Sequence, residues 1–385
     1  MLYHLFEYLK NCGCDFPGIN LMNFISFRAM VAAVISLCVS LIAGRRIINR
    51  LKAAQIGETI RDLGLQGQME KKGTPTMGGI IIILAVVCGA VMVCDLTNIY
   101  TILMLVTTLW CGALGFADDY IKVFKHNKEG LSEKKKLIFQ FGLGLIVALT
   151  MCLSQTIHTE QILTTIPFLK ANEFDYSWLS PFSGQIGVYC TWGIYMAIII
   201  LVILACSNGA NLTDGMDGLS AGTSAIVGVV LGVLAYLGGN VNDAAYLNIM
   251  YLRDSGEVAV FMAAFAGALL GFLWYNSFPA EVFMGDTGSL TIGGIIGVCA
   301  VLIRKELLLP LLCGIFVAES ASVLIQRHWF KYTRKKYGEG RRVFLMAPLH
   351  HHYQKKNIPE PRIVSRFWVV GIILGVATLA LLKIR

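Results

Sequence analysis

Long apolar stretches alternate with short polar ones along nearly the whole chain. An α-helix needs about 20 apolar residues, within a range of about 17 to 25, to cross the hydrocarbon core of a bilayer. Ten stretches meet this requirement, and we predict a transmembrane helix at each: 24–44, 78–94, 99–115, 137–153, 188–206, 219–237, 257–275, 287–303, 307–325 and 365–382. The pattern predicts an all-α polytopic membrane protein with a single integral membrane domain over residues 1–385.

Composition agrees with this prediction. Hydrophobic residues make up 56% of the chain and charged residues 15%, with a mean hydropathy of +0.66. Soluble domains are about 25% charged, so this chain falls outside their range. Arg45 and Arg46 follow the first apolar stretch, and no small-residue cleavage pattern is present, so we interpret this stretch as a retained span and not a signal peptide.

Positive charge is distributed unevenly between the predicted loops. The odd-numbered loops hold 23 Lys and Arg residues and the even-numbered loops hold 4. Because such residues favour the cytoplasmic side, the odd loops are predicted to be cytoplasmic and both termini to lie outside. The net charge of +8 then reflects topology and contact with anionic headgroups, and it gives no reason to expect nucleic acid as a partner.

Two carboxylates lie in the loop 208–219, which reads Asn-Gly-Ala-Asn-Leu-Thr-Asp-Gly-Met-Asp-Gly-Leu. An Asp at the centre of a bilayer costs about 2.5 to 3.5 kcal/mol, so Asp214 and Asp217 belong at the water interface or in a solvated cavity. The glycines allow a ligand to approach the backbone closely. Alternatively, the two acids cap the helix that follows, and this loop alone does not separate the two interpretations.

Two adjacent acids, Asp118 and Asp119, follow the third predicted helix. This helix runs from outside to inside, so its negative dipole end faces the cytoplasm and capping does not explain the acids. Lys122 and Lys125 can supply part of the positive charge they need. Paired carboxylates suit a hard divalent ion such as Mg²⁺, which favours metal or phosphate chemistry over a merely solvated acidic pair.

The loop 71–79, Lys-Lys-Gly-Thr-Pro-Thr-Met-Gly-Gly, leads into the second predicted helix. The N-terminus of that helix presents free backbone N–H groups to the cytoplasm, next to Lys72 and Thr76, which is typical of an anion site. Lysines that only set the topology are the alternative.

The loop before the eighth predicted helix contains Asn276, Phe283 and Asp286. Asp286 binds a ligand or caps the helix. Phe283 and Asn276 either stack on and hydrogen-bond a base, or are an interfacial aromatic residue and a polar loop residue.

The last cytoplasmic loop combines most of the positive charge with His350, His351 and His352. Three consecutive histidines cannot all ligate one metal, and no His-Glu-x-x-His motif is present, which argues against a zinc protease. Next to Arg and Lys, these histidines are better interpreted as donors to phosphate oxygens or as proton carriers. A chance cluster in a basic loop is the alternative.

All five polar motifs fall in predicted cytoplasmic loops, so they can meet on one face of the membrane. Acids, an anion-binding helix start and basic groups together are what metal-assisted phosphoryl transfer requires.

The motifs Lys-Lys-Gly-Thr-Pro-Thr-Met-Gly-Gly, Asn-Leu-Thr-Asp-Gly-Met-Asp-Gly-Leu, Phe-Met-Gly-Asp-Thr-Gly-Ser-Leu and Ala-Pro-Leu-His-His-His occur in this order over almost the whole chain. In these motifs the chain resembles the phospho-N-acetylmuramoyl-pentapeptide transferases, within the polyprenyl-phosphate N-acetylhexosamine-1-phosphate transferase superfamily. Departures from the family pattern are Met216, Ala117 and Gln354. Gln354 stands where an acid often follows the histidines, so it leaves open how they are hydrogen-bonded.

The resemblance implies transfer of phospho-N-acetylmuramoyl-pentapeptide from UDP to undecaprenyl phosphate with release of UMP, for peptidoglycan synthesis at the bacterial cytoplasmic membrane. It also implies Mg²⁺ and a homodimer. Asp286 would ligate the metal, with Asp118 and Asp119 beside it as further candidate ligands and next to the lipid phosphate. The nucleotide and phosphate site would be lined by Lys72, Thr76, Lys122, Asn211, Asp214, Gly215, Asp217, Asn276 and Phe283. His350, His351 and His352 would contact the diphosphate or the sugar.

A phosphate monoester has a second pKa near 6, so the lipid phosphate is mostly dianionic at neutral pH and needs no strong base. This favours direct attack on the β-phosphorus over a covalent aspartyl-phosphate route. A sister transferase that uses UDP-N-acetylglucosamine is the alternative enzyme. A secondary transporter is the alternative from another class, but its charged groups should lie near the midplane in paired repeats, and neither feature is seen in the sequence.

Overall fold

A computed structural model describes residues 1–13, 18–54, 73–125, 127, 130–154, 162–166 and 173–383. Lys72, predicted to bind an anion, lies outside the described residues. Within the described ranges, eight helices are long and apolar enough to cross a membrane. They are α2 (Ile25–Ala53), α4 (Ile99–Phe124), α5 (Glu133–Leu153), α6 (Gly184–Thr213), α7 (Leu219–Gly238), α9 (Gly256–Asn276), α10 (Gly285–Leu302) and α14 (Glu360–Leu381).

The two other predicted spans are also helical but depart from single straight helices. The stretch 307–325 is broken: η4 (Glu306–Leu308) and α11 (Leu309–Leu312) are followed by α12 (Gly314–Tyr337) after a bend of 75°. Counted as one span, this bent pair is the ninth. The stretch 78–94 forms α3 (Gly79–Val93), an apolar helix of 15 residues. The prediction of an all-α polytopic membrane protein is confirmed.

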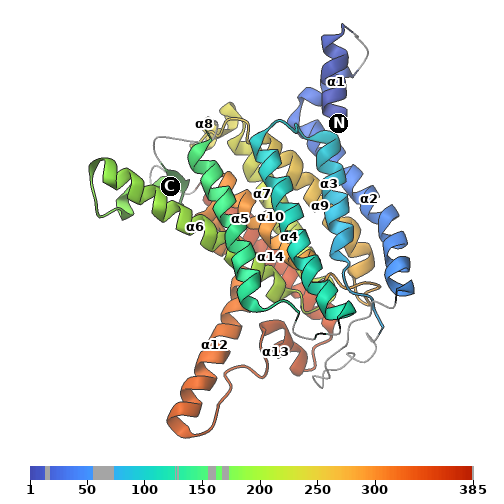
Figure 1. The fold of residues 1–385 in the computed structure, drawn as a ribbon, viewed down its shortest axis with the longest axis vertical. Helices are drawn as coiled ribbons and strands as arrows, with labels where there is room; N and C mark the ends of the chain where they lie inside the picture. Colours follow the sequence, from blue (N-terminus) through green and yellow to red (C-terminus); the bar gives the residue numbers. More distant parts are fainter. Residues whose placement is uncertain are drawn as a thin grey trace.

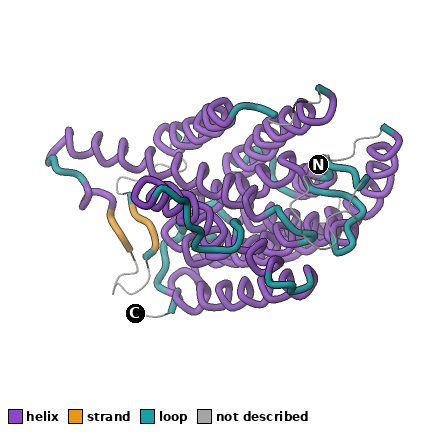
Figure 2. The backbone as a smooth tube through the Cα atoms, turned by 90° about the horizontal axis from the view of Figure 1, so that it is seen from below, coloured by secondary structure: helices purple, strands orange, loops and turns teal. Residues whose placement is uncertain are grey.

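The remaining described elements are short. They are α1 (Leu2–Asn11), η1 (Ile19–Asn23), β1 (Leu163–Thr165), β2 (Glu173–Asp175), η3 (Tyr176–Leu179), α8 (Val241–Leu247) and α13 (Leu349–Lys355). Strands β1 and β2 form an antiparallel pair with Leu163 opposite Asp175. Viewed from below, this pair lies at the edge of the helix bundle (Figure 2).

The bundle is built around α9 and α10. In the most apolar stretch of these helices, 78% of the residues of α9 and 89% of those of α10 are buried. Helices α2, α3 and α7 pack on α9, and α4 and α6 pack on α10. Burial on all sides explains why both central helices are apolar around their whole circumference.

The polar loops gather at one end of the bundle. Helix α12 and the following α13 project from that end, where α4 ends and α5 begins (Figure 1). Both chain termini lie toward the opposite end (Figure 1). The assignment of this end to the cytoplasm, with both termini outside, stays a prediction.

Close backbone contact holds α3, α4 and α10 together at this end. A Cβ atom on Gly79 would lie 2.1 Å from the backbone nitrogen of Gly288, and one on Gly115 would lie 2.3 Å from the carbonyl oxygen of Asp286. The chain segments before α3 and α10 also pair: Phe283 N donates to Pro75 O at 2.8 Å, and Gly78 N donates to Phe283 O at 2.8 Å. Glycine is required where helices approach this closely.

Candidate active site

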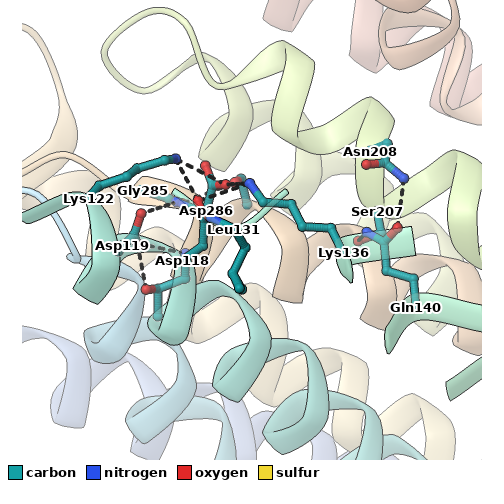
Figure 3. A network of polar contacts seen from close by, with 12 residues as sticks. Asp118, Asp119, Lys122, Leu131, Lys136, Gln140, Ser207, Asn208, Gly285 and Asp286 are labelled. Atoms are coloured by element: carbon teal, nitrogen blue, oxygen red, sulfur yellow. Dashed lines mark hydrogen bonds and ion pairs between the residues drawn. The ribbon is translucent and has the colours of Figure 1, made fainter. Parts of the chain in front are cut away.

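Three carboxylates from two helices meet where α4 ends and α10 begins. Asp118 and Asp119 belong to the last two turns of α4, and Asp286 belongs to the first turn of α10. One oxygen from each lies within 4.8 Å of the others. Figure 3 shows the three side chains converging from these two helices.

Asp119 is held by the N-terminus of α10. Its Oδ2 accepts hydrogen bonds from Thr287 N at 2.9 Å and Thr287 Oγ1 at 2.6 Å, and its Oδ1 accepts from Asp286 N at 3.2 Å. A carboxylate on the free N–H groups of a helix start is favourable. Asp119 thus performs the capping that the sequence allowed for Asp286, and the N-cap residue of α10 makes no side-chain cap bond of its own.

Two lysines neutralise the other two acids. Lys122 Nζ lies 2.6 Å from Asp118 Oδ2 and 3.2 Å from Asp286 Oδ2, and Lys136 Nζ lies 2.9 Å and 2.6 Å from the same two oxygens. The side chain of Asp118 is fully buried, whereas that of Asp286 is 14% exposed. Leu131 N donates to Asp118 Oδ1 at 2.6 Å and covers it from the loop side. Of the carboxylates that Lys122 and Lys136 share, Asp286 is therefore the one open to a ligand.

Lys136 is not among the site residues predicted from the sequence. The signal that could have found it is helical spacing. Lys136 lies one turn before the fully buried Gln140, on the inward face of α5, whereas Lys134 and Lys135 are exposed.

A buried amide network fixes the inward face of α5. Gln140 Nε2 donates to Ser207 Oγ at 3.0 Å and Asn208 Nδ2 donates to Gln140 Oε1 at 2.9 Å (Figure 3). Ser207 Oγ in turn donates to Leu290 O at 3.1 Å. These bonds join α5, α6 and α10. The network sets the register in which Lys136 reaches the acids.

The donor set fits a divalent cation. With all three acids ionised, three carboxylates against two ammonium groups carry one net negative charge. Carboxylate oxygens are the ligands that hard cations prefer. The cluster can therefore hold a metal ion through Asp286 together with Asp118 and Asp119.

The loop between α6 and α7 is tied to the loop before α10. Asp217 Oδ2 accepts a hydrogen bond from Ala280 N at 3.1 Å. Asn276 Oδ1 accepts from Gly218 N at 3.0 Å, and Asn276 Nδ2 donates to Val282 O at 2.9 Å. Asp217 and Asn276 thus hold these two loops together, and contact between their side chains and a ligand stays a prediction.

The neighbouring predicted residues are more open. Gly215 is exposed, and Asn211 and Asp214 at the end of α6 are half-buried. Phe283 is half-buried between its backbone bonds to Pro75 and Gly78. These four residues, Asn211, Asp214, Gly215 and Phe283, keep surface available for a ligand.

Thr76 lies close to the acids. A Cβ atom built on Gly285 would lie 3.1 Å from Thr76 Oγ1 and 2.6 Å from Asp119 Oδ2. The positive φ of 71° at Gly285 likewise favours glycine there. The segment before α3 and the first turn of α10 therefore form one surface.

Each histidine has a different partner. His350 is buried and its Nδ1 lies 3.1 Å from Glu319 Oε2. His351 Nδ1 lies 3.1 Å from Gln354 Oε1, which shows that the glutamine still bonds the histidine segment. His352 Nδ1 accepts from Leu345 N at 3.1 Å. Desolvation, with a smaller effect of Lys356, lowers the pKa of His352, so its ring is neutral at pH 7 with the proton on Nε2.

His350 is the histidine that points at the α6–α7 loop. A Cβ atom on Gly215 would lie 2.1 Å from His350 Nε2. This nitrogen is buried and has no hydrogen-bond partner among the described residues. Because the Glu319 carboxylate accepts from Nδ1–H, Nε2 is the atom left to meet a ligand. Glu319 was missed in the sequence, although an acid within an apolar stretch is itself a signal of a functional site.

The site and the fold define a class: the chain is a polytopic membrane glycosyl transferase, since the model of Glycosyl transferase family 4 matches residues 101–304. Phospho-N-acetylmuramoyl-pentapeptide-transferase signature 1 matches residues 71–83. Transferases of that name from Parabacteroides distasonis and Flavobacterium psychrophilum are 53% and 52% identical over 421 and 410 residues, and the match covers 100% of both chains in each case. The chain belongs to the phospho-N-acetylmuramoyl-pentapeptide-transferase family.

Replacing Lys136 tests the cluster. Lys136→Met leaves Asp118 and Asp286 facing each other with only Lys122 between them. Removing one partner of a buried ion pair costs about 3 to 5 kcal/mol, and less here because Lys136 is 18% exposed. We expect a lower thermal unfolding midpoint in detergent and turnover reduced at least about tenfold. The same substitution at the exposed Lys135 should change neither quantity. If Lys136→Met and Lys135→Met have the same unfolding midpoint and the same turnover, Lys136 is not part of the site.

Proposed function

We propose that this chain transfers phospho-N-acetylmuramoyl-pentapeptide from its UDP carrier to undecaprenyl phosphate, giving lipid I and UMP, as the first membrane step of peptidoglycan synthesis. It acts in the bacterial cytoplasmic membrane with its carboxylate end toward the cytoplasm, as a homodimer. The observation that carries the proposal is the convergence of Asp118, Asp119 and Asp286 at one end of the bundle in a chain of this family.

We assign Mg²⁺ to the carboxylate cluster. Asp286 would be the principal ligand, because its side chain is the one open to solvent, and Asp118 and Asp119 would complete the acidic wall. Bound there, Mg²⁺ supplies neutralisation of negative charge on the phosphate oxygens. Lys122 and Lys136 would also neutralise negative charge on the phosphates, since both ammonium groups lie at the acids where the phosphates would bind.

Direct attack of the lipid phosphate on the β-phosphorus is the mechanism that fits the burial of Asp118. A covalent route through Asp118 would need this carboxylate to be accessible, but its side chain is fully buried, contacts two lysines and accepts from Leu131 N. Asp118 positions the lysines, and the dianionic lipid phosphate supplies the nucleophilic oxygen.

The nucleotide sugar would occupy the surface between this cluster and His350. Phe283, Asn211, Asp214 and Gly215 line its open side, with Asp217 and Asn276 fixing the loops behind them. His350 Nε2 reaches this surface at Gly215, where it can donate to a diphosphate oxygen when the ring is protonated.

UMP release by the purified protein in detergent tests this function. We expect release only when UDP-N-acetylmuramoyl-pentapeptide, undecaprenyl phosphate and Mg²⁺ are all present, and none when UDP-N-acetylglucosamine replaces the nucleotide substrate. A stoichiometric burst of UMP before lipid is added would overturn direct attack, and turnover with UDP-N-acetylglucosamine alone would assign the chain a different substrate.

Glu319 is expected to act by positioning His350. Glu319→Ala should lower kcat about 10- to 100-fold, the range seen when a partner that orients a functional histidine is lost, while KM for the nucleotide changes little. Glu319→Asp keeps a carboxylate and should recover part of kcat. The exposed Glu339→Ala serves as the control. Wild-type kcat in Glu319→Ala would show that the pair is only structural.

A further inference from the structure

A cavity of about 370 Å³ opens between three helices that carry none of the three clustered aspartates. Its walls are the start of α12, one side of α13, and the positions Ile363, Phe367, Val370 and Leu374 of α14. Spacings of three and four residues place those four side chains on one face of α14. Opposite them on α12 lie Gly314 and the small Ala318. A Cβ atom on Gly314 would lie 2.9 Å from Leu374 Cδ1, so α12 and α14 approach each other closely at this end of the cavity. We refer to this cavity as the α12–α14 slot.

The slot is apolar along its length and basic at one end. Of the described residues that line it, one is charged: Arg366, which is exposed. A second cation lies close by, because Lys356 Nζ is 5.9 Å from the ring centroid of the lining residue Tyr353. The acid nearest in sequence, Glu360, is buried and accepts a hydrogen bond from Asp217 N at 2.8 Å.

The basic end lies near the start of α14, next to α13, and the apolar end runs along α14 toward Leu374. Since α14 is long and apolar enough to cross a membrane, the slot extends from the interface into the hydrocarbon region. A cationic mouth above an apolar channel is complementary to a phosphate headgroup with a hydrocarbon chain below it.

We propose that the α12–α14 slot binds one acyl chain of an anionic phospholipid of the surrounding bilayer, with its phosphate at Arg366 and Lys356. A volume of 370 Å³ is at the low end of ligand pockets and suits one acyl chain better than an eleven-isoprene polyprenyl chain. An interface with a second copy of the chain would need a broad face of about 800 Å² per partner and not a slot.

A lipid in the slot would also brace the histidine segment. Leu349 and Ala318 line the slot, and each is followed directly in the chain by a member of the His350–Glu319 pair. Filling the slot would hold α13 against α12, so bound lipid would stabilise the orientation of His350. This consequence rests on the proposed function, whereas the binding of the lipid does not.

Native mass spectrometry of the full-length protein tests the binding. The protein would be released from detergent containing phosphatidylglycerol or phosphatidylcholine with identical acyl chains. We expect one phosphatidylglycerol per chain to be retained about tenfold more tightly than phosphatidylcholine, in line with attraction by two basic side chains. Arg366→Ala should remove most of this difference between the lipids. Val370→Trp should fill the slot and lower retention of phosphatidylglycerol about tenfold, while Val369→Trp, at the neighbouring exposed position that does not line the slot, should leave it unchanged.

Three kinds of result would overturn the proposal. The first is the loss of an expected difference in retention, either between the two phospholipids on the wild-type chain or between Val370→Trp and Val369→Trp. The second is a raised KM for undecaprenyl phosphate in Val370→Trp with normal phosphatidylglycerol retention, which would assign the slot to the acceptor. The third is a changed oligomeric mass in Val370→Trp, which would assign it to a second copy. Because retention is counted without turnover, its failure is distinguishable from failure of the proposed function.

Discussion

An Asp286→Asn variant is expected to lose transfer activity by about a thousandfold, or about 4 kcal/mol of transition-state stabilisation. The amide keeps the size of the side chain but removes the charge most open to a divalent cation, because the Asp286 side chain is 14% exposed whereas that of Asp118 is fully buried. The measurement is the initial rate of UMP release across a Mg²⁺ titration. We expect the residual activity to require a higher Mg²⁺ concentration than the wild type.

The matched control for this variant is Glu281→Gln. Glu281 lies in the same loop, five residues before Asp286, and is exposed. It should retain wild-type turnover and the wild-type Mg²⁺ dependence. Thermal unfolding in detergent must show that Asp286→Asn is folded; a folded Asp286→Asn protein with near-normal Mg²⁺-dependent turnover would refute the assignment of the metal site.

The membrane helices were predictable because the bilayer imposes one length and one polarity on every span. Each of the ten apolar stretches is helical, from α2 to α14. The break in the stretch 307–325 was not predictable. This stretch is as apolar as its neighbours, yet it bends by 75° between α11 and α12; its one proline, Pro310, lies at the start of α11 and not at the bend. Gly314 lies at the bend, but single glycines such as Gly89 of α3 also occur within helices that continue through them, so the sequence does not mark where this stretch breaks.

The residue types of the candidate site were also predictable, but the role of each residue was not. The sequence could not decide between capping and ligand binding for Asp286, because that choice depends on a partner from another helix. In the structure, Asp119, which lies 167 residues before Asp286 in the chain, caps the N-terminus of α10. The Asp286 carboxylate is therefore available to the lysines and to a ligand. Lys136 and Glu319 were missed for a related reason. Lys136 is one of three consecutive lysines at the start of α5, and Glu319 is one acid within an apolar stretch; in both cases the partner that gives the residue its role lies on another helix.

A Gly115→Ala variant tests whether the contact between helices creates the site. The added Cβ atom would lie 2.3 Å from the carbonyl oxygen of Asp286 and 2.5 Å from Thr287 Cα, which are backbone atoms of α10 that no rotamer change can move. Helix α4 must then move away from α10, and Asp118 and Asp119 move with it. We expect a loss of stability of about 1 to 3 kcal/mol or more together with a loss of activity on the order of 100-fold, since small displacements of positioning groups have effects of that size.

Gly193→Ala is the control for this substitution. Gly193 is an exposed helical glycine on α6, and no atom lies within 4 Å of the position that an added Cβ would take, so alanine should be neutral or stabilise the helix by about 0.5 to 1 kcal/mol. Thermal unfolding and UMP release measured on both variants separate two causes. If Gly115→Ala unfolds at the wild-type temperature and retains full turnover, the close approach of α4 and α10 does not determine the geometry of the acids, and the cluster must be held by its own ion pairs.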